Sequence, residues 1–188
     1  MIDDIPLIIF AGGKSRRMGQ DKALLPFGGY PSLAEFQYSK FTPYFKHIYL
    51  SSKTDKFDFD CRVIKDTHKD ASPLVAILSV FETLEAEEVF ILSVDAPFVN
   101  IDVIEKILAQ REETVDIVVA QSPSGIQPLC GSYKKTMLAL AYQQVAEGNH
   151  KLRDLLALAQ TKEVLFEEDT PFTNLNKPEE YQDALNLF

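Results

Sequence analysis

Two kinds of apolar pattern alternate along this chain. In short runs such as LIIF and VFILSV nearly every position is apolar, which is typical of strands covered on both faces. Longer stretches carry apolar residues at helical spacing, as in 151–160, where four leucines form one buried face. The predicted strands are 6–10, 47–50, 62–64, 89–94, 115–120 and 163–166, with a further apolar stretch at 128–133. The predicted helices are 32–41, 73–84, 101–111, 134–147, 151–160 and one that begins at Pro178.

This alternation of strands and helices predicts the fold class. Strands separated by helices form βαβ units, in which the strands run parallel and the helices cover the sheet. At 188 residues the chain can bury one sizeable core, so we expect a single domain over 1–188. The expected architecture is α/β, with a mostly parallel central sheet flanked by helices.

The overall charge limits the partners. A formal net charge of −9 argues against general binding to nucleic acid or to an anionic membrane, because both rely on a broad excess of Lys and Arg. The sequence has no apolar stretch near the roughly 20 residues that cross a bilayer, and its first residues lack the pattern of a secretory signal. Cys61 and Cys130 occur without a CxxC motif or a neighbouring histidine, so they indicate neither zinc nor a disulfide framework. We expect a cytoplasmic protein.

The carboxyl ends of the predicted strands are the expected ligand site, because ligands of parallel α/β sheets bind there. Three places qualify: the loop that starts at Ala11, Asp66 after its short strand, and Asp95 after VFILSV. Pro97 stops that strand from continuing, so the Asp95 carboxylate should project into the ligand crevice. The alternative role for Asp95 is to cap the helix near Ile101.

The loop after the first strand joins glycines to basic residues. It is not a P-loop, because GxxxxGK[ST] would require glycine in place of Ile8, and the glycines also lack the GxGxxG spacing. Gly12 and Gly13 allow backbone N–H groups to approach an anion closely, and the Lys and Arg residues that follow can neutralise it. A triphosphate fits this chemistry. A solvated basic surface loop is the alternative.

The same loop carries a resemblance to a known family. Residues 11–22, AGGKSRRMGQDK, resemble the AGGxSxRMGxDK signature of the molybdenum cofactor guanylyltransferases, the MobA family. Asp21 and Lys22 favour this family over the nucleotidyltransferases that have Pro-Lys at that place. Further similar segments are VIKD at 63–66, SVDAPF at 93–98, QPL at 127–129 and FTNLNKPEE at 172–180. The resemblance covers nearly the whole chain and implies a three-layer, Rossmann-like nucleotidyltransferase fold.

The resemblance implies an activity. The terminal phosphate of molybdopterin, with or without bound molybdenum, attacks the α-phosphorus of GTP; pyrophosphate leaves and molybdenum guanine dinucleotide forms. The expected substrates are GTP and molybdopterin or molybdenum-molybdopterin, and the expected cofactor is Mg²⁺. Transient contacts with molybdoenzyme-maturation proteins are a further option. Another small nucleotidyltransferase, using CTP on the pterin or an NTP on a sugar phosphate, is the alternative enzyme. A nucleotide-binding regulator without turnover is the alternative from another class.

Site residues follow from the resemblance together with the chemistry of phosphate. Asp95 would bind Mg²⁺, which takes oxygen ligands. Lys22 would contact phosphate as a point charge and Arg17 would hold phosphate oxygens bidentately, and surface solubility is the alternative for both. The implied catalytic residues are Arg17, Lys22 and Asp95. The implied nucleotide-binding residues are Phe10, Ala11, Gly12, Gly13, Lys22, Ser51, Asp66 and Asp95.

The chain also departs from the family pattern near the expected base pocket. Ser51 stands where some members have an asparagine, and SPLVA at 72–76 stands where the family shows GPLAG. These departures concern the preference for guanine rather than the binding of phosphate.

Asn174 and Asn176 are the candidate acceptor-binding residues. At spacing i, i+2 in an extended segment they direct their amides to one face, and each amide offers donors and an acceptor. A pterin edge or a bridging phosphate needs that mixture. The alternative is that one of them caps the last helix, because Asn favours caps and Pro178 favours the first helical position.

Overall fold

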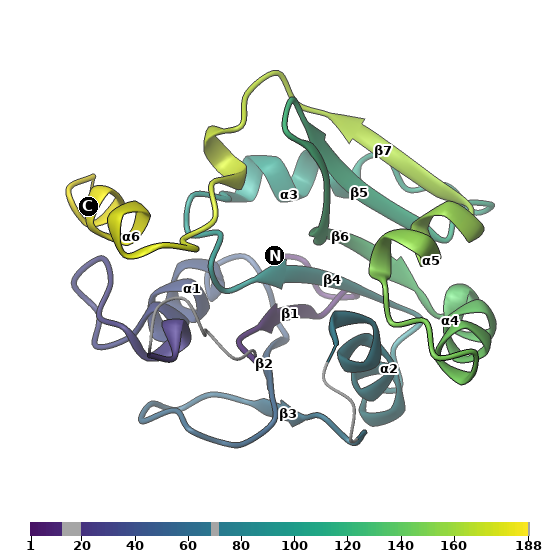
Figure 1. Ribbon diagram of the computed structural model, residues 1–188, viewed down its shortest axis with the longest axis horizontal. Helices are drawn as coiled ribbons and strands as arrows, with labels where there is room; N and C mark the ends of the chain where they lie inside the picture. Colours follow the sequence, from purple (N-terminus) through teal and green to yellow (C-terminus); the bar gives the residue numbers. More distant parts are fainter. Residues whose placement is uncertain (13–19, 69–71, 188) are drawn as a thin grey trace.

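A seven-stranded sheet forms the middle layer of the protein, with strand order β3-β2-β1-β4-β6-β5-β7 (Figure 1). The computed structural model describes residues 1–12, 20–68 and 72–187. Every neighbouring pair runs parallel except the two that β6 makes, with β4 and with β5. The strands are β1 (Leu7–Phe10), β2 (Ile48–Ser52), β3 (Val63–Lys65), β4 (Glu88–Ser93), β5 (Ile117–Ser122), β6 (Gly125–Lys134) and β7 (Thr161–Leu165).

Helices cover both faces of this sheet. On β1, Leu7 and Ile9 pack in one core with α1, α3 and α6, while Ile8 and Phe10 pack in the other with α2, α4 and α5. Alternate side chains of a strand therefore pack into two cores on opposite faces of the sheet. The predicted three-layer α/β architecture is confirmed. The helices are α1 (Leu33–Phe41), α2 (Pro73–Thr83), α3 (Ile101–Leu108), α4 (Leu138–Ala146), α5 (Leu152–Leu158) and α6 (Pro178–Leu185), with 3₁₀ turns η1 (Lys22–Leu24), η2 (Lys135–Met137) and η3 (Thr170–Phe172).

The strand β6 departs most from its predicted form. The apolar stretch at 128–133 is part of a longer antiparallel strand, which follows β5 through a tight turn at 123–124. Gln127 pairs with Ala120 and Gly131 pairs with Val119, so the three residues between Gln127 and Gly131 bulge out of the β5 ladder. A Cβ on Gly131 would lie 2.5 Å from the Val118 carbonyl oxygen, so this strand position requires glycine.

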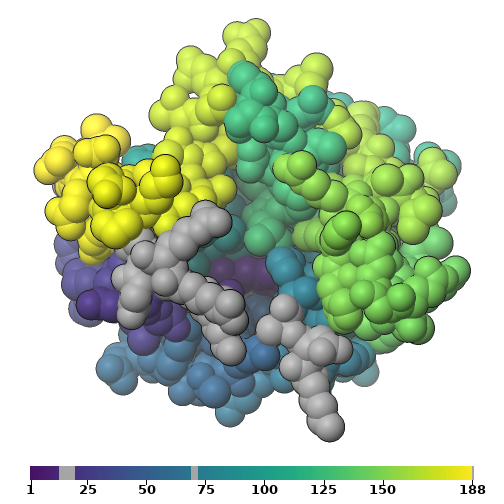
Figure 2. All heavy atoms as spheres, in the orientation of Figure 1, coloured from purple at the N-terminus to yellow at the C-terminus, as the bar shows by residue number. Residues whose placement is uncertain are grey.

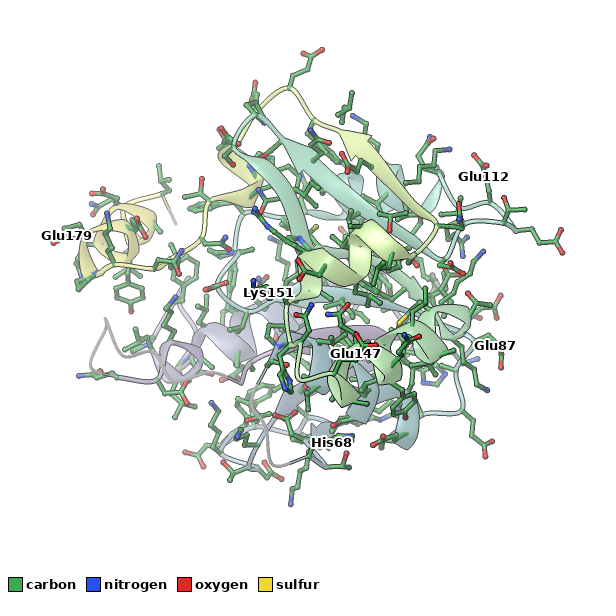
Figure 3. All side chains as sticks on the ribbon, turned by 45° about the vertical axis from the view of Figure 1, so that its right-hand side comes forward. His68, Glu87, Glu112, Glu147, Lys151 and Glu179 are labelled. Atoms are coloured by element: carbon green, nitrogen blue, oxygen red, sulfur yellow. The ribbon has the colours of Figure 1, made fainter. Side chains whose placement is uncertain are left out.

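The outer surface carries the acidic charge. Glu87, Glu112 and Glu179 project outward at the edges of the molecule in Figure 3.

Cys61 and Cys130 are both free thiols. None of the helices within 1–12, 20–68 and 72–187 has the length and apolar character that a membrane span requires.

Candidate functional site

The carboxyl ends of the first four strands of the sheet meet at one edge. Phe10 pairs with Ser51 of β2 on one side and with Ser93 of β4 on the other. The loops that leave from Ala11, Asp66 and Asp95 therefore start at the same edge. Figure 2 shows this face hollowed at its centre, with purple atoms of the N-terminal residues at the floor and yellow and green atoms of the C-terminal half around it.

Asp95 is the centre of the polar contacts at this edge. Its Oδ1 accepts a hydrogen bond from the Ser93 hydroxyl at 2.6 Å, and its Oδ2 lies 3.0 Å from the Lys22 ammonium. Lys22 Nζ also donates to Oδ1 of Asn176 at 2.9 Å. These side chains are 73 and 154 residues away from Lys22 along the chain. The fold therefore brings together a predicted catalytic cation, a predicted metal ligand and a predicted acceptor residue.

The alternative role for Asp95, as a helix cap, is wrong. Asn100 is the N-cap of α3, and its Oδ1 accepts a hydrogen bond from Val103 N at 3.1 Å. Both carboxylate oxygens of Asp95 are instead directed to Ser93 and Lys22. The carboxylate therefore belongs to the edge of the sheet and not to the helix that follows.

Neither asparagine of the C-terminal segment caps α6. The N-cap is Lys177, and the Glu180 carboxylate accepts hydrogen bonds from the backbone N–H groups of Asn176 and Lys177 at 2.7 and 2.9 Å. Leu175 N donates to the Asp95 carbonyl at 2.9 Å, which ties this segment to the end of β4. The amides of Asn174 and Asn176 are thus available to the site.

A pocket of about 200 Å³ lies beside Asp95. Its lining comes from Ser93, Asp95 and Ala96, from residues 127–130 at the β6 bulge, and from Phe172 and Asn174. The fully buried Tyr133 donates its hydroxyl to the Pro128 carbonyl, so the core of the sheet holds the bulge in place. The pocket therefore has one wall from the end of β4 and a second from β6 and the C-terminal segment.

Contacts of Asp21 and Lys56 hold the turn that carries Lys22. Asp21 Oδ1 caps η1 by accepting a hydrogen bond from Ala23 N at 3.1 Å, and its Oδ2 is ion-paired with Lys56. Lys56 Nζ also donates to the Ala11 carbonyl at 2.9 Å, so it joins the turn to the end of β1. Sequence reasoning missed Lys56 because it lies in an acidic loop with no periodic pattern or motif.

The remaining predicted nucleotide-binding residues and the predicted catalytic residue Arg17 fall into two groups. Phe10, Ala11 and Gly12 lead away from the end of β1, and the Ala11 N–H donates to the Ser51 carbonyl at 2.9 Å. Gly13 and Arg17 lie outside the described residues.

Asp66 carries an unusual buried oxygen. Among the described residues its Oδ1 has no hydrogen-bond partner although the atom is buried. Burial raises the pKa of the Asp66 carboxyl, and the nearby Lys53 ammonium and the Ser51 hydroxyl oppose this rise. A buried acceptor without a donor is costly, so this oxygen suits a hydrogen bond from a ligand.

Comparisons with known proteins agree with this geometry. Residues 7–164 match the family model for the MobA-like NTP transferase domain. A Campylobacter jejuni protein named molybdenum cofactor guanylyltransferase is 36% identical over 183 residues, which cover 96% of this chain and 95% of that protein. A Helicobacter pylori protein of the same name is 30% identical over 193 residues, covering 100% of this chain and 91% of that protein.

A solved structure supports the same fold. Molybdopterin-guanine dinucleotide biosynthesis protein A from Archaeoglobus fulgidus superposes with a TM-score of 0.84 at 18% identity, over 97% of this chain and 98% of that one. At this identity the likeness shows the fold alone, and it confirms the predicted nucleotidyltransferase architecture.

Proposed function

Because this chain belongs to the MobA-like NTP transferase family, we propose that it transfers GMP from GTP to the phosphate of molybdopterin, with or without bound molybdenum. The observation that carries this proposal is the contact of Lys22 with both Asp95, which lines the pocket, and Asn176. A cation between a carboxylate and an amide is suited to phosphate groups that arrive from two substrates. We propose that residues 1–188 act as one domain and that the reaction takes place in the cytoplasm.

The nucleotide would occupy the edge formed by β1, β2 and β3. The backbone from Phe10 to Gly13 would approach the phosphates, with Lys22 and Arg17 neutralising their charge. Asp66, whose Oδ1 is buried without a donor among the described residues, would accept a hydrogen bond from the nucleotide beside Ser51.

The donors around Asp95 fit Mg²⁺. Within the described residues no group of three or more His, Cys, Asp or Glu side chains could hold a metal ion by itself. Mg²⁺ is commonly bound through one or two carboxylates together with substrate phosphates and water, so Asp95 fits as its protein ligand. When bound, the ion would neutralise charge that develops on the phosphates.

The chemistry needs positioning more than a protein nucleophile. An oxygen of the molybdopterin phosphate attacks the α-phosphorus of GTP in line with the leaving group, the bond from that phosphorus to the bridging oxygen breaks, and pyrophosphate leaves. Lys22 would hold phosphate oxygens during this exchange as a point charge.

The acceptor would occupy the pocket of about 200 Å³ beside Asp95. Asn174 lines that pocket, and Asn176 contacts Lys22, whose ammonium is ion-paired with Asp95. Their amides would bind the pterin edge and the acceptor phosphate. In this arrangement the acceptor phosphate would lie near Asp95, the residue that Lys22 contacts.

A pyrophosphate-release assay with each of the four NTPs and purified molybdopterin tests the proposal. We expect release with GTP in the presence of Mg²⁺. Preferential release of pyrophosphate with CTP would show that the chain is a cytidylyltransferase instead. This comparison is needed because SPLVA at 72–76 departs from the GPLAG of the family. Binding of GTP without any release would make the chain a nucleotide-binding regulator.

A further inference from the structure

The segment that carries Asp95 is held mainly by groups from other parts of the chain. It leaves β4 at Ser93 and reaches α3 at Ile101 without regular secondary structure. The Asp95 carbonyl accepts from Leu175 N at 2.9 Å. The carbonyls on either side of it, those of Val94 and Ala96, accept from a single side chain, the amide of Gln37, at 3.5 and 3.0 Å. The backbone that flanks Asp95 is thus fixed from α1.

Gln37 is an exception on the buried face of its helix. It is 0% exposed, although the neighbouring buried residues of α1, such as Phe36 and Phe41, are apolar. Within the described part of the chain its Oε1 has no partner, so only the Nε2 end of the amide is compensated. A buried amide with one end unpartnered is a costly choice where an apolar side chain would pack. A role of this amide in fixing the backbone segment around Asp95 would explain why a glutamine stands here.

A neighbouring residue of α1 holds the later part of the same segment. Lys40 Nζ donates to the carbonyls of Pro97 and Val99 at 2.7 and 2.6 Å. Lys40 follows Gln37 by three positions, so both side chains lie on one face of the helix. The two residues divide the segment: Gln37 contacts the backbone next to Asp95, and Lys40 contacts the backbone further on.

We propose that Gln37 is a positioning residue for Asp95, which orients the carboxylate for the divalent metal by holding the carbonyls on either side of it. This inference rests on the proposed function, because it assumes that Asp95 is the metal ligand. Gln37 itself touches neither substrate nor metal. Its effect would pass through two backbone carbonyls to the direction in which the Asp95 carboxylate points.

The chain offers a matched control. Gln144 on α4 is also a buried glutamine, 3% exposed, and its Nε2 donates to the Lys151 carbonyl at 2.8 Å. Its Oε1, like that of Gln37, lacks a partner among the described residues. The two glutamines therefore share burial, an Nε2 that donates to a backbone carbonyl and an Oε1 without a partner among the described residues, but the carbonyl that Gln144 binds is that of Lys151, far from Asp95 in the chain. Replacing each by methionine removes the donor and keeps nearly the same volume.

The experiment compares Gln37→Met, Gln144→Met and the wild type, with Asp95→Asn as reference. Binding of Mn²⁺ is measured by electron paramagnetic resonance in the presence of a GTP analogue with a methylene group between the α- and β-phosphates. We expect Gln37→Met to weaken Mn²⁺ binding about fivefold and to lower kcat about tenfold, because small misplacements of a site group reduce rates steeply. Affinity for metal-free GTP should stay the same. Gln144→Met should change the melting temperature similarly and leave Mn²⁺ binding and kcat unaltered.

Each outcome decides one point. Equal behaviour of Gln37→Met and Gln144→Met in Mn²⁺ binding and kcat would overturn the inference, because Gln37 would then serve stability alone. If Gln37→Met does not fold, Gln37→Asn keeps an amide that is one methylene too short to reach both carbonyls, and the same result is expected. A wild type that binds Mn²⁺ through Asp95 but releases no pyrophosphate would overturn the proposed function and leave the role of Gln37 intact, since resonance does not need turnover.

Discussion

Two halves of the sheet build opposite sides of the same hollow by different means. The half that we propose binds the nucleotide, strands β3, β2, β1 and β4, is called the nucleotide half and is parallel throughout. Its two carboxylates lie at strand ends: Asp66 follows β3 directly, and Asp95 lies two residues after β4. The half that we propose binds the acceptor, strands β6, β5 and β7 with the segment 166–176, is called the acceptor half and contains the antiparallel β6. Its wall is made by a bulge at 128–130 and by a chain segment that returns to the end of β4.

This difference separates two ways of placing a side chain. In the nucleotide half, strand register alone brings the three loops to one edge, because parallel strands end on the same side. In the acceptor half, placement depends on long-range contacts such as that of Leu175 N with the Asp95 carbonyl. Substitutions in the first half should therefore act on metal and triphosphate, and those in the second on the acceptor.

The largest effect is expected at Asp95. Asp95→Asn should lower turnover about 10²-fold or more, because the charge of the metal ligand is lost at the reacting phosphates. Binding of GTP without Mg²⁺ should be similar in both forms. Asp116→Asn is the control, since that carboxylate precedes β5 and binds Thr136 and the Gln160 N–H. Near-normal turnover of Asp95→Asn in the pyrophosphate assay would remove Asp95 from the site.

Lys22 comes next. Lys22→Ala should lose about 1.5–3 kcal/mol of transition-state stabilisation from charge-assisted contacts, measured through kcat/KM. Because the ammonium contacts Asp95 Oδ2 at 3.0 Å, its removal should also strengthen Mn²⁺ binding in the absence of nucleotide. Lys46→Ala, which removes an exposed lysine, is the control. Weaker Mn²⁺ binding in Lys22→Ala would show that the lysine does not compete with metal for the carboxylate.

The two asparagines test the acceptor half. The double variant Asn174→Ala with Asn176→Ala should raise the KM for molybdopterin about tenfold and leave GTP affinity unchanged, because polar groups that bind the acceptor are removed. Glu179→Gln is the control, since that carboxylate is exposed in the first turn of α6, where a negative charge stabilises the helix. It should lower the melting temperature with little effect on KM. Loss of stability in the double variant with unchanged acceptor kinetics would remove both asparagines from the site.

The smallest effect concerns Asp66 and pH. Burial raises the pKa of this carboxyl in the folded chain above 3.8, its ordinary value, which applies to the unfolded chain. At a pH in the window between the unfolded-state and folded-state pKa, the folded chain therefore keeps a proton that the unfolded chain has lost. Stability contributed by this group is present below that window and falls as pH rises through it. Asp66→Asn should therefore raise the melting temperature at pH 7 by about 1–2 °C and weaken GTP binding about tenfold.

Thermal unfolding from about pH 3 to pH 7 and GTP titration check the prediction for Asp66. Asp60→Asn, at an exposed position of the neighbouring loop, is the control. Higher stability with unchanged GTP affinity would contradict the nucleotide-binding role of Asp66.

The nucleotide half was largely predictable from the sequence. Its two central strands, β1 and β4, are largely apolar because both faces are covered, Asp66 follows β3 directly, and Asp95 lies two residues after β4. The family signature at 11–22 then predicted a phosphate-binding role for this segment and singled out Lys22. These features are local, so they leave a pattern in neighbouring residues.

The acceptor half and the supporting contacts were less predictable. The bulge of β6 interrupts the period-2 pattern, and Pro128 within the strand disfavours a regular ladder. The contact of Lys22 with Asn176 joins residues 154 positions apart, and no spacing rule relates them. Gln37 did leave a signal, since it is a polar residue on the buried face of a helix, but the sequence alone does not show what such a residue contacts.

Because the C-terminal segment follows the last strand, it is synthesised after the whole sheet. Leu175, Asn176 and Tyr181 bind Asp95, Lys22 and the Pro26 carbonyl, yet all three follow the last strand. A ribosome adds about 5–20 residues per second and releases the N-terminal parts first, so all seven strands emerge before this segment does. The sheet can form on the ribosome while the site still lacks its far wall. A chain stalled just after β7 would therefore lack the segment that contacts Asp95 and Lys22, and with it the proposed acceptor wall.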